Sequence, residues 1–133
     1  MASDLGDYLA NEILGWISGE AMPSAPGDVY VGLFDGDPGF DGAGGTEVTE
    51  SIRVAGRVAV TFGAAAGRAI VSSADIDFGA SAGTVDVTHA AIFDAASDGN
   101  MLMKEALLTP RSITTGDPVI IATGDLSFGF PTT

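Results

Sequence analysis

The stretch that decides the fold is Gly83–Pro110, which reads GTVDVTHAAIFDAASDGNMLMKEALLTP. It contains two runs with strand character, Thr84–Phe93 and Met101–Leu108. Between them lies Asp94–Asn100, a polar segment of small residues of the kind that reverses a chain. The stretch therefore predicts an antiparallel hairpin with a long loop.

The first run of this hairpin alternates in side-chain character, which is typical of a half-buried antiparallel strand. We expect one face to carry Val85, Val87, His89, Ala91 and Phe93. The opposite face carries Asp86, Thr88 and Ala90, and Ile92 interrupts its polarity near the loop. The stretch contains no reactive constellation of side chains, and this shapes the functional interpretation.

Composition and patterning extend the β prediction to the rest of the chain. The 133 residues are 46% hydrophobic and include 19 Gly and 6 Pro, which favours one domain with many turns and short strands. Further strands are expected at Asp28–Phe34, Arg53–Phe62, Ala69–Ser72, Asp75–Phe78, Pro118–Ala122 and Asp125–Phe130. No βαβ rhythm is present. We predict a mainly β fold, an antiparallel β-sandwich of about seven to eight short strands with one N-terminal amphipathic α-helix.

The helix is expected at residues 4–18, DLGDYLANEILGWIS, with Ser3 as its N-cap and Gly19 at its end. Its apolar stripe recurs at helical spacing. The candidate interface residues on this stripe are Leu5, Leu9, Ile13, Trp16 and Ile17. We expect residues 1–19 to pack on the domain's own sheet or on a neighbouring subunit, and residues 20–133 to form the β-sandwich.

The charge of the chain restricts its partners. The net charge is −13, Asp outnumbers Glu by thirteen to five, and Lys104 is the one lysine. Such a surface suits a protein kept soluble in concentrated salt, where the Debye length falls to about 3 Å at 1 M. An ordinary acidic surface is the alternative. Nucleic acid and anionic membranes are excluded as partners because no basic patch is available to neutralise phosphates.

Targeting and redox signals are missing from the sequence. The start, MASDLGDYL, is acidic where a signal peptide is basic. The apolar runs are far shorter than the roughly 20 residues of a membrane helix. With no Cys, the chain has neither a disulfide framework nor a thiolate metal site.

The acidic, glycine-rich segment Asp35–Ser51 raises the question of calcium. Hard cations need clustered oxygen ligands, and Asp35, Asp37 and Asp41 lie close together in sequence. The spacing fails the EF-hand rule, since its sixth position is Phe40 rather than Gly. A solvated acidic loop is the alternative to a weak site for Ca²⁺ or another cation, and apart from such a cation no cofactor is expected.

The sequence offers no catalytic constellation. His89 is the one histidine, no nucleophile-elbow motif accompanies it, and its strand position favours a packed or interface residue. The DGAGG segment lacks the Lys-Ser/Thr of a phosphate loop. Acid pairs are plentiful, but a chain with a single Trp has little room for a sugar-binding cleft. We therefore predict a non-enzymatic protein without catalytic or cofactor-binding residues.

An ordered series of short motifs gives the chain a family resemblance. They are YVGLF (Tyr30–Phe34), GGTEV (Gly44–Val48), RVAVTF (Arg57–Phe62), DIDF (Asp75–Phe78), GTVxxTHxxIFDAxxxGN (Gly83–Asn100), TGD (Thr115–Asp117) and GDL (Gly124–Leu126). With the short helix before them, these motifs cover nearly the whole chain. The chain resembles small structural proteins of tailed viruses, often labelled tail-fibre-like.

The resemblance implies a virion component, assembled in the host cytoplasm, on the capsid surface or in the tail, without catalytic residues. Joined to the acidity, it implies a haloarchaeal tailed virus. Because a fibre shaft needs repeats or long coiled coils, we expect a capsid decoration or turret protein. Its expected partners are copies of itself, with a trimer as the assembly, and the major capsid protein or tail proteins. The alternatives are a tail or fibre-base component and a calcium- or glycan-binding adhesion module.

Overall fold

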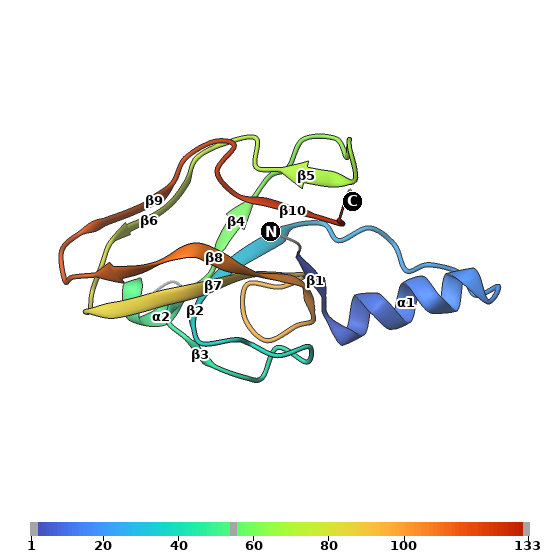
Figure 1. Ribbon diagram of the computed structural model, residues 1–133, viewed down its shortest axis with the longest axis horizontal. Coiled ribbons are helices and arrows are strands. Elements are labelled where there is room, and N and C mark those ends of the chain that lie inside the picture. Colours follow the sequence, from blue (N-terminus) through green and yellow to red (C-terminus); the bar gives the residue numbers. More distant parts are fainter. Residues whose placement is uncertain (1–2, 54–55, 132–133) are drawn as a thin grey trace.

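The computed structural model describes residues 3–53 and 56–131 and is mainly β, with antiparallel sheets and one helix near the N-terminus (Figure 1). This confirms the predicted fold class, with ten short strands in the described residues. The strands are β1 (Asp4–Leu5), β2 (Val29–Asp35), β3 (Thr46–Glu47), β4 (Val58–Val60), β5 (Ala69–Val71), β6 (Ile76–Ala80), β7 (Val85–Phe93), β8 (Met101–Ile113), β9 (Pro118–Ile121) and β10 (Ser127–Gly129). The helices are α1 (Asp7–Ile17) and the single turn α2 (Thr49–Ile52).

The predicted hairpin forms the centre of the largest sheet. The strand order is β1-β8-β7-β2-β3, and β4 also pairs with β2. All of these pairs are antiparallel. Two two-stranded ribbons, β5 with β10 and β6 with β9, complete the β structure (Figure 1).

The main hydrophobic core draws on the large sheet and on both ribbons, so the arrangement is sandwich-like with a divided second layer. Its buried members are Val31, Leu33, Val48, Ile52, Val60, Ile76, Phe78, Val87, Ala90, Ile92, Met103, Val119, Leu126 and Phe128. Phe62 meets Phe128 edge to face, with ring centroids 6.3 Å apart, which joins the chain after β4 to β10.

The register of the hairpin contains an irregularity that the sequence did not reveal. Val87 pairs with Arg111 whereas His89 pairs with Ala106, so residues 107–110 of β8 oppose a single residue of β7. The second strand therefore runs on to Ile113, beyond the predicted end at Leu108. Leu108 projects from this bulge and is 88% exposed.

The alternation of β7 breaks beside this bulge, so the prediction that Val87, Ala91 and Phe93 share one face was wrong. Val87 lies in the main core together with Ala90 and Ile92. Beyond the bulge, Ala91 and Phe93 lie in a second cluster on the other face. Strand side chains alternate with a period of two, so an irregularity that breaks this alternation moves every later side chain to the opposite face.

The helix begins later than predicted. Residues 4 and 5 form β1, which pairs with β8, and the N-cap of α1 is Gly6 rather than Ser3. A Cβ atom on Gly6 would lie 2.3 Å from the carbonyl oxygen of Met101, so this close approach requires glycine. The predicted end is confirmed: Gly19 has a φ of +106° and donates its N–H to the carbonyl of Trp16.

The region after β2 is more ordered than a long loop. The predicted connection at residues 35–51 contains β3 and the start of α2. The predicted strand Arg53–Phe62 is represented by the shorter β4, and its residues 54–55 lie outside the described residues. None of the described helices is long and apolar enough to cross a membrane.

Candidate functional site

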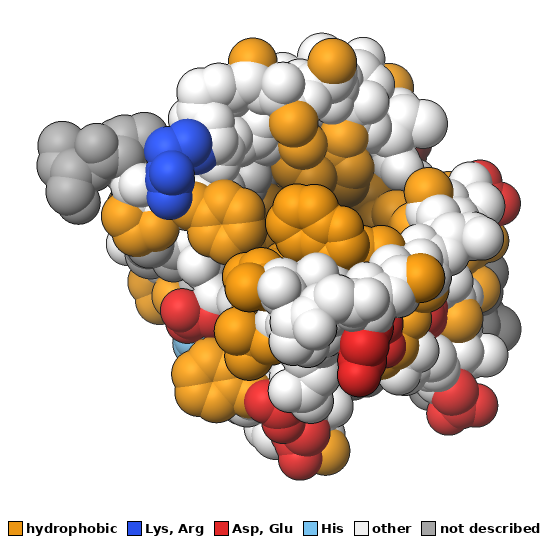
Figure 2. Space-filling model, turned by 90° about the vertical axis from the view of Figure 1, so that its right-hand side faces the viewer, with side chains coloured by type: hydrophobic (Ala, Val, Ile, Leu, Met, Phe, Trp, Pro, Cys, Tyr) orange, Lys and Arg blue, Asp and Glu red, His pale blue; other side chains and the backbone are white. Residues whose placement is uncertain are grey.

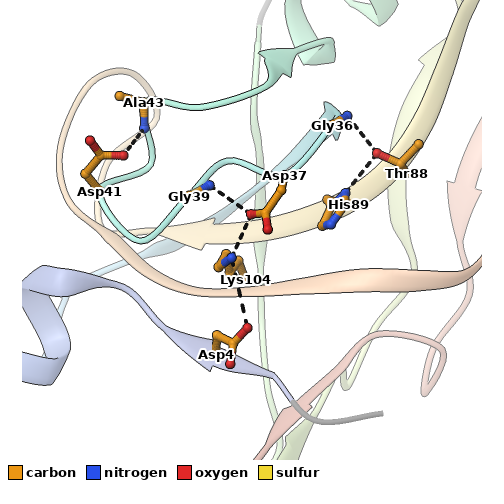
Figure 3. A network of polar contacts seen from close by, with 9 residues as sticks. All are labelled: Asp4, Gly36, Asp37, Gly39, Asp41, Ala43, Thr88, His89 and Lys104. Carbon is orange, nitrogen blue, oxygen red and sulfur yellow. Dashed lines mark hydrogen bonds and ion pairs between the residues drawn. The ribbon is translucent and has the colours of Figure 1, made fainter.

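The acidic loop, residues 36–45 between β2 and β3, is organised around the buried side chain of Lys104 on β8 (Figure 3). Its ammonium Nζ lies 2.6 Å from Oδ1 of Asp37 and 4.0 Å from Oδ2 of Asp4 on β1. The same nitrogen lies 4.6 Å from the ring centroid of Phe40. Lysine is rarely buried without such partners, so the loop and β1 together satisfy the charge of the one lysine.

The contact with Lys104 changes the pKa of Asp37. The hydrogen bond from Lys104 lowers the pKa of the Asp37 carboxyl, and the bond from the backbone N–H of Gly39 lowers it further. The carboxylate thus holds the turn of its own loop as well as the neighbouring strand.

The three calcium candidates have separate roles within the described residues. Figure 3 shows Asp37 pointing toward Lys104, while Asp41 lies at another bend of the loop and accepts the N–H of Ala43. Asp35 is the exposed last residue of β2. In residues 3–53 and 56–131, no group of three or more His, Asp or Glu side chains is arranged to hold a metal ion. Calcium binding therefore stays a prediction.

A second contact that holds the acidic loop involves Thr88 and His89 on β7. The Nδ1 of His89 is 2.8 Å from Oγ1 of Thr88, and that hydroxyl oxygen accepts the N–H of Gly36 at 2.7 Å (Figure 3). His89 also pairs in register with Phe34 of β2. These contacts place the half-buried His89 beside Thr88 on β7, and a packed or interface role for it stays a prediction.

A second ionic cluster holds the hairpin loop against β3. Arg57 donates from Nε and Nη2 to the two carboxylate oxygens of Glu47, at 2.7 and 3.0 Å. Its Nη1 donates to the carbonyls of Ala95 and Asp98. The guanidinium carbon lies 3.4 Å from the ring centroid of Phe93. We call this cluster the Arg57 clamp.

The helix α1 differs from both clusters because most of it stands away from the β structure (Figure 1). No residue of α1 is fully buried. Its first turn lies against the sheet, where Leu9 packs on the main core, as does Leu5 from β1. At its far end Leu14, Trp16 and Ile17 are 62%, 61% and 68% exposed. Of the candidate interface residues, Ile13 is half-buried between these two ends.

An apolar hollow of about 460 Å³ opens beside this helix. Figure 2 shows this side of the molecule, with hydrophobic side chains gathered around a depression at its centre. The hollow is lined by α1, the segment after it, β2, the chain after β4, β5 and the hairpin; the lining includes Tyr8, Leu9, Met22, Pro23, Pro26, Val29, Phe62, Ile70, Ile92 and Leu102. We call it the helix-side hollow.

Several of these features escaped sequence analysis. Lys104 meets Asp37 across 67 positions of sequence, and no local pattern links the two. The helix-side hollow is likewise assembled from segments distant in the chain. The sequence did hold a signal for Arg57. With five basic residues against eighteen acidic ones, each basic side chain is expected to have carboxylates near it.

The fold and these surfaces define a small antiparallel β protein with a projecting N-terminal helix, and its described residues hold no group of three or more His, Asp or Glu arranged for a metal ion. Within this class, the chain belongs to the family Gp80, described as podophage GP4 fiber I protein gp80, whose model matches residues 4–129. Membership of this family indicates that the chain is a fibre-like structural protein of a tailed virus. A comparison with curated proteins gave no match.

Proposed function

We propose that this chain is a non-enzymatic structural protein of a tailed virus of a halophilic host, and that it decorates the capsid surface as a decoration or turret protein. The observation that carries the proposal is α1, whose exposed apolar end is available for contact in a chain that belongs to a virion-fibre family. Exposed clusters of this kind mark protein–protein contact sites in soluble proteins.

In this proposal copies of the chain associate, as a trimer, and α1 holds them to one another or to the major capsid protein. Closed symmetric oligomers are the usual form of such assemblies. The tail or fibre-base role is the second candidate, and the description of the family as a fibre protein favours it.

The location in the particle separates the two candidates. Capsids and tails are to be separated from purified virions, and the chain quantified in each fraction by mass spectrometry. We expect the chain in the capsid fraction, in a ratio to the major capsid protein that reflects a repeated surface site. Its presence in the tail fraction alone would overturn the capsid proposal and support the fibre-base role.

The halophilic part of the proposal rests on the net charge of −13 and has its own test. Molar salt screens the repulsion among carboxylates. We therefore expect the melting temperature to be higher in molar KCl than in dilute buffer. An unchanged or lower melting temperature would contradict a halophilic host.

A further inference from the structure

We infer that the helix-side hollow holds a basic, amphipathic segment of a different protein, with its apolar side chains in the hollow and a Lys or Arg side chain beside Asp94. The inference names the chemistry of the partner in the attachment to other virion proteins proposed above, and it rests on that proposal. A second copy of this chain is a poor occupant, because the net charge of −13 opposes contact between copies.

The lining of the hollow offers apolar surface that its own chain leaves partly uncovered. The half-buried side chains that line it and also pack on the main core are Leu9, Val29, Phe62, Ile70 and Leu102. Met22 lines it as well and is 42% exposed, and the flexible thioether of methionine adapts to the shape of a partner. A volume of about 460 Å³ is in the range of pockets that hold sizeable apolar groups.

The charge around the hollow favours a cationic occupant. Residues 1–28, which include α1 and the segment after it, contain five carboxylates and no Lys, Arg or His. Among the described residues that line the hollow, Asp94 is the one charged side chain. Figure 2 shows carboxylates beside the hydrophobic side chains of this face. A partner that carries Lys or Arg next to its apolar residues therefore gains an attraction that an acidic apolar partner lacks.

Asp94 is held in place for such a cation. Its Oδ1 accepts the backbone N–H of Asn100 at 2.7 Å, and its Oδ2 accepts a hydrogen bond from Nδ2 of the same residue at 3.0 Å. An ionised carboxylate has about four lone-pair sites, so Asp94 can accept a further bond from Lys or Arg. Because Asp94 is half-buried, concentrated salt screens its ion pair less than that of an exposed carboxylate.

Synthetic peptides test the charge and the pattern of the occupant. The probe is a dye-labelled peptide of leucine and lysine, about four helical turns long, with its leucines on one helical face. Its controls are the same peptide with glutamate in place of lysine and a scrambled peptide of the same composition as the probe. In molar KCl we expect anisotropy titrations to show that the probe binds at least about tenfold more tightly than either control. Equal binding of the three peptides, or no binding of the probe, would overturn the inference.

Two matched pairs of substitutions test whether the probe enters the hollow. Met22→Gln removes an apolar side chain from the hollow, and Leu108→Gln removes one from the exposed bulge of β8. Asp94→Asn removes the charge of the hollow, and Asp125→Asn removes an exposed charge that does not line it. We expect the first member of each pair to weaken binding of the probe about threefold or more, and the second to leave it within about twofold.

Equal effects within both pairs would contradict the inference. If Met22→Gln weakened self-association in sedimentation and left binding of the probe unchanged, the hollow would be a contact between copies and the inference would be wrong.

Cross-linking tests where the probe lies, because the chain contains no cysteine. Ser24→Cys at the hollow and Ser97→Cys on the hairpin loop place a thiol at two exposed positions, and the probe carries a terminal cysteine. We expect the probe to form a disulfide with Ser24→Cys several times faster than with Ser97→Cys, and equal rates would overturn the inference. Because these tests use purified protein and a peptide, their failure would leave the proposed function intact, which depends on where the chain lies in the virion.

Discussion

The acidic loop is held from several sides, whereas α1 is held only near its start. Lys104 and Thr88 both bond to the loop, and the carbonyl of Phe40 in turn accepts the N–H of Asp7 at the base of α1. Beyond its first turn the helix meets little of the β structure, and its apolar end is exposed. The segment that is glycine-rich and acidic is therefore the fixed one, and the amphipathic segment is the one left free to bind.

The Arg57 clamp, which holds β3 at the end of the acidic loop, gives the largest expected effect. Arg57→Ala removes a two-point ion pair and two bonds to the hairpin loop from a side chain that is only 8% exposed. We expect the free energy of unfolding to fall by about 3 kcal/mol in urea titrations.

Arg111→Ala is the control for this prediction, since Arg111 lies on the exposed stretch of β8. Its change should stay within about 0.5 kcal/mol. If the two variants lost equal stability, the clamp would have no special role in fixing the loop.

The base of α1 gives the next largest effect. In Gly6→Ala the new Cβ would meet the carbonyl of Met101, and the strand beneath the helix must shift. We expect the free energy of unfolding to fall by about 2 kcal/mol, measured by the same urea titration. Gly27→Ala is the matched control, because no atom lies within 4 Å of its added Cβ. A loss at Gly27 as large as that at Gly6 would show that the base of the helix is not tightly packed.

The dependence of stability on pH tests the role of Asp37. Because its pKa in the folded protein is lowered, mainly by Lys104, the carboxylate stabilises the fold above the unfolded pKa, and this contribution is lost as pH falls through the folded value. Since the Asp37 side chain is 56% exposed, solvent reduces the effect to about 0.5–1 kcal/mol. We expect Asp37→Asn to lose this amount at pH 7 and to flatten the stability profile below pH 4. An unchanged profile would contradict the Lys104 attachment.

Glu105, next to Lys104 on β8, should respond in the opposite direction. Partial burial raises the pKa of its carboxyl, although a hydrogen bond from Ser3 acts against the rise. The charged form therefore lowers stability as pH rises through the range from the unfolded to the folded pKa. We expect Glu105→Gln to raise the melting temperature slightly at pH 7 and to have no such effect at pH 3. A loss of stability at pH 7 would contradict this assignment.

The free end of α1 gives the smallest expected effect on folding. Ile17→Ser removes a side chain that is 68% exposed and leaves the first turn of the helix untouched. In dilute, monomeric protein we expect the free energy of unfolding to change by less than about 0.5 kcal/mol in urea. A loss above about 1.5 kcal/mol would show that this end of the helix belongs to the core of its own chain.

Sequence predicts the parts of this molecule that depend on local patterns. The hairpin, β2 and the glycine at the end of α1 follow from alternation, turn residues and capping rules. The faces of β7 could not be predicted, because the bulge opposite Thr88 depends on how β8 pairs. The start of α1 was missed because residues 4–5 pair with a strand about a hundred positions away.

The residues of the candidate sites also fall into two groups, those that a local pattern predicts and those that distant segments bring together. The apolar stripe of α1 is a local pattern that the sequence predicts, although Leu5 lies on β1, and the use of this stripe as an interface stays a prediction. Burial of Lys104 depends on Asp4 and Asp37, which come to it from two distant segments. The same long-range assembly explains why the helix-side hollow had no signal in the sequence.

Residue-resolved hydrogen exchange of the dilute and the concentrated protein tests the central contrast most directly. Gly36, Gly39 and Gly44 donate hydrogen bonds within or beneath the acidic loop, so their amides should exchange slowly at both concentrations. The amides at the end of α1, residues 16–20, are also hydrogen-bonded, but this end of the helix is not packed on the β structure, so fraying should make them exchange faster than the loop amides in dilute protein, and association should protect them. Loop amides that exchange as fast as an open chain, or α1 amides unchanged by concentration, would contradict the account.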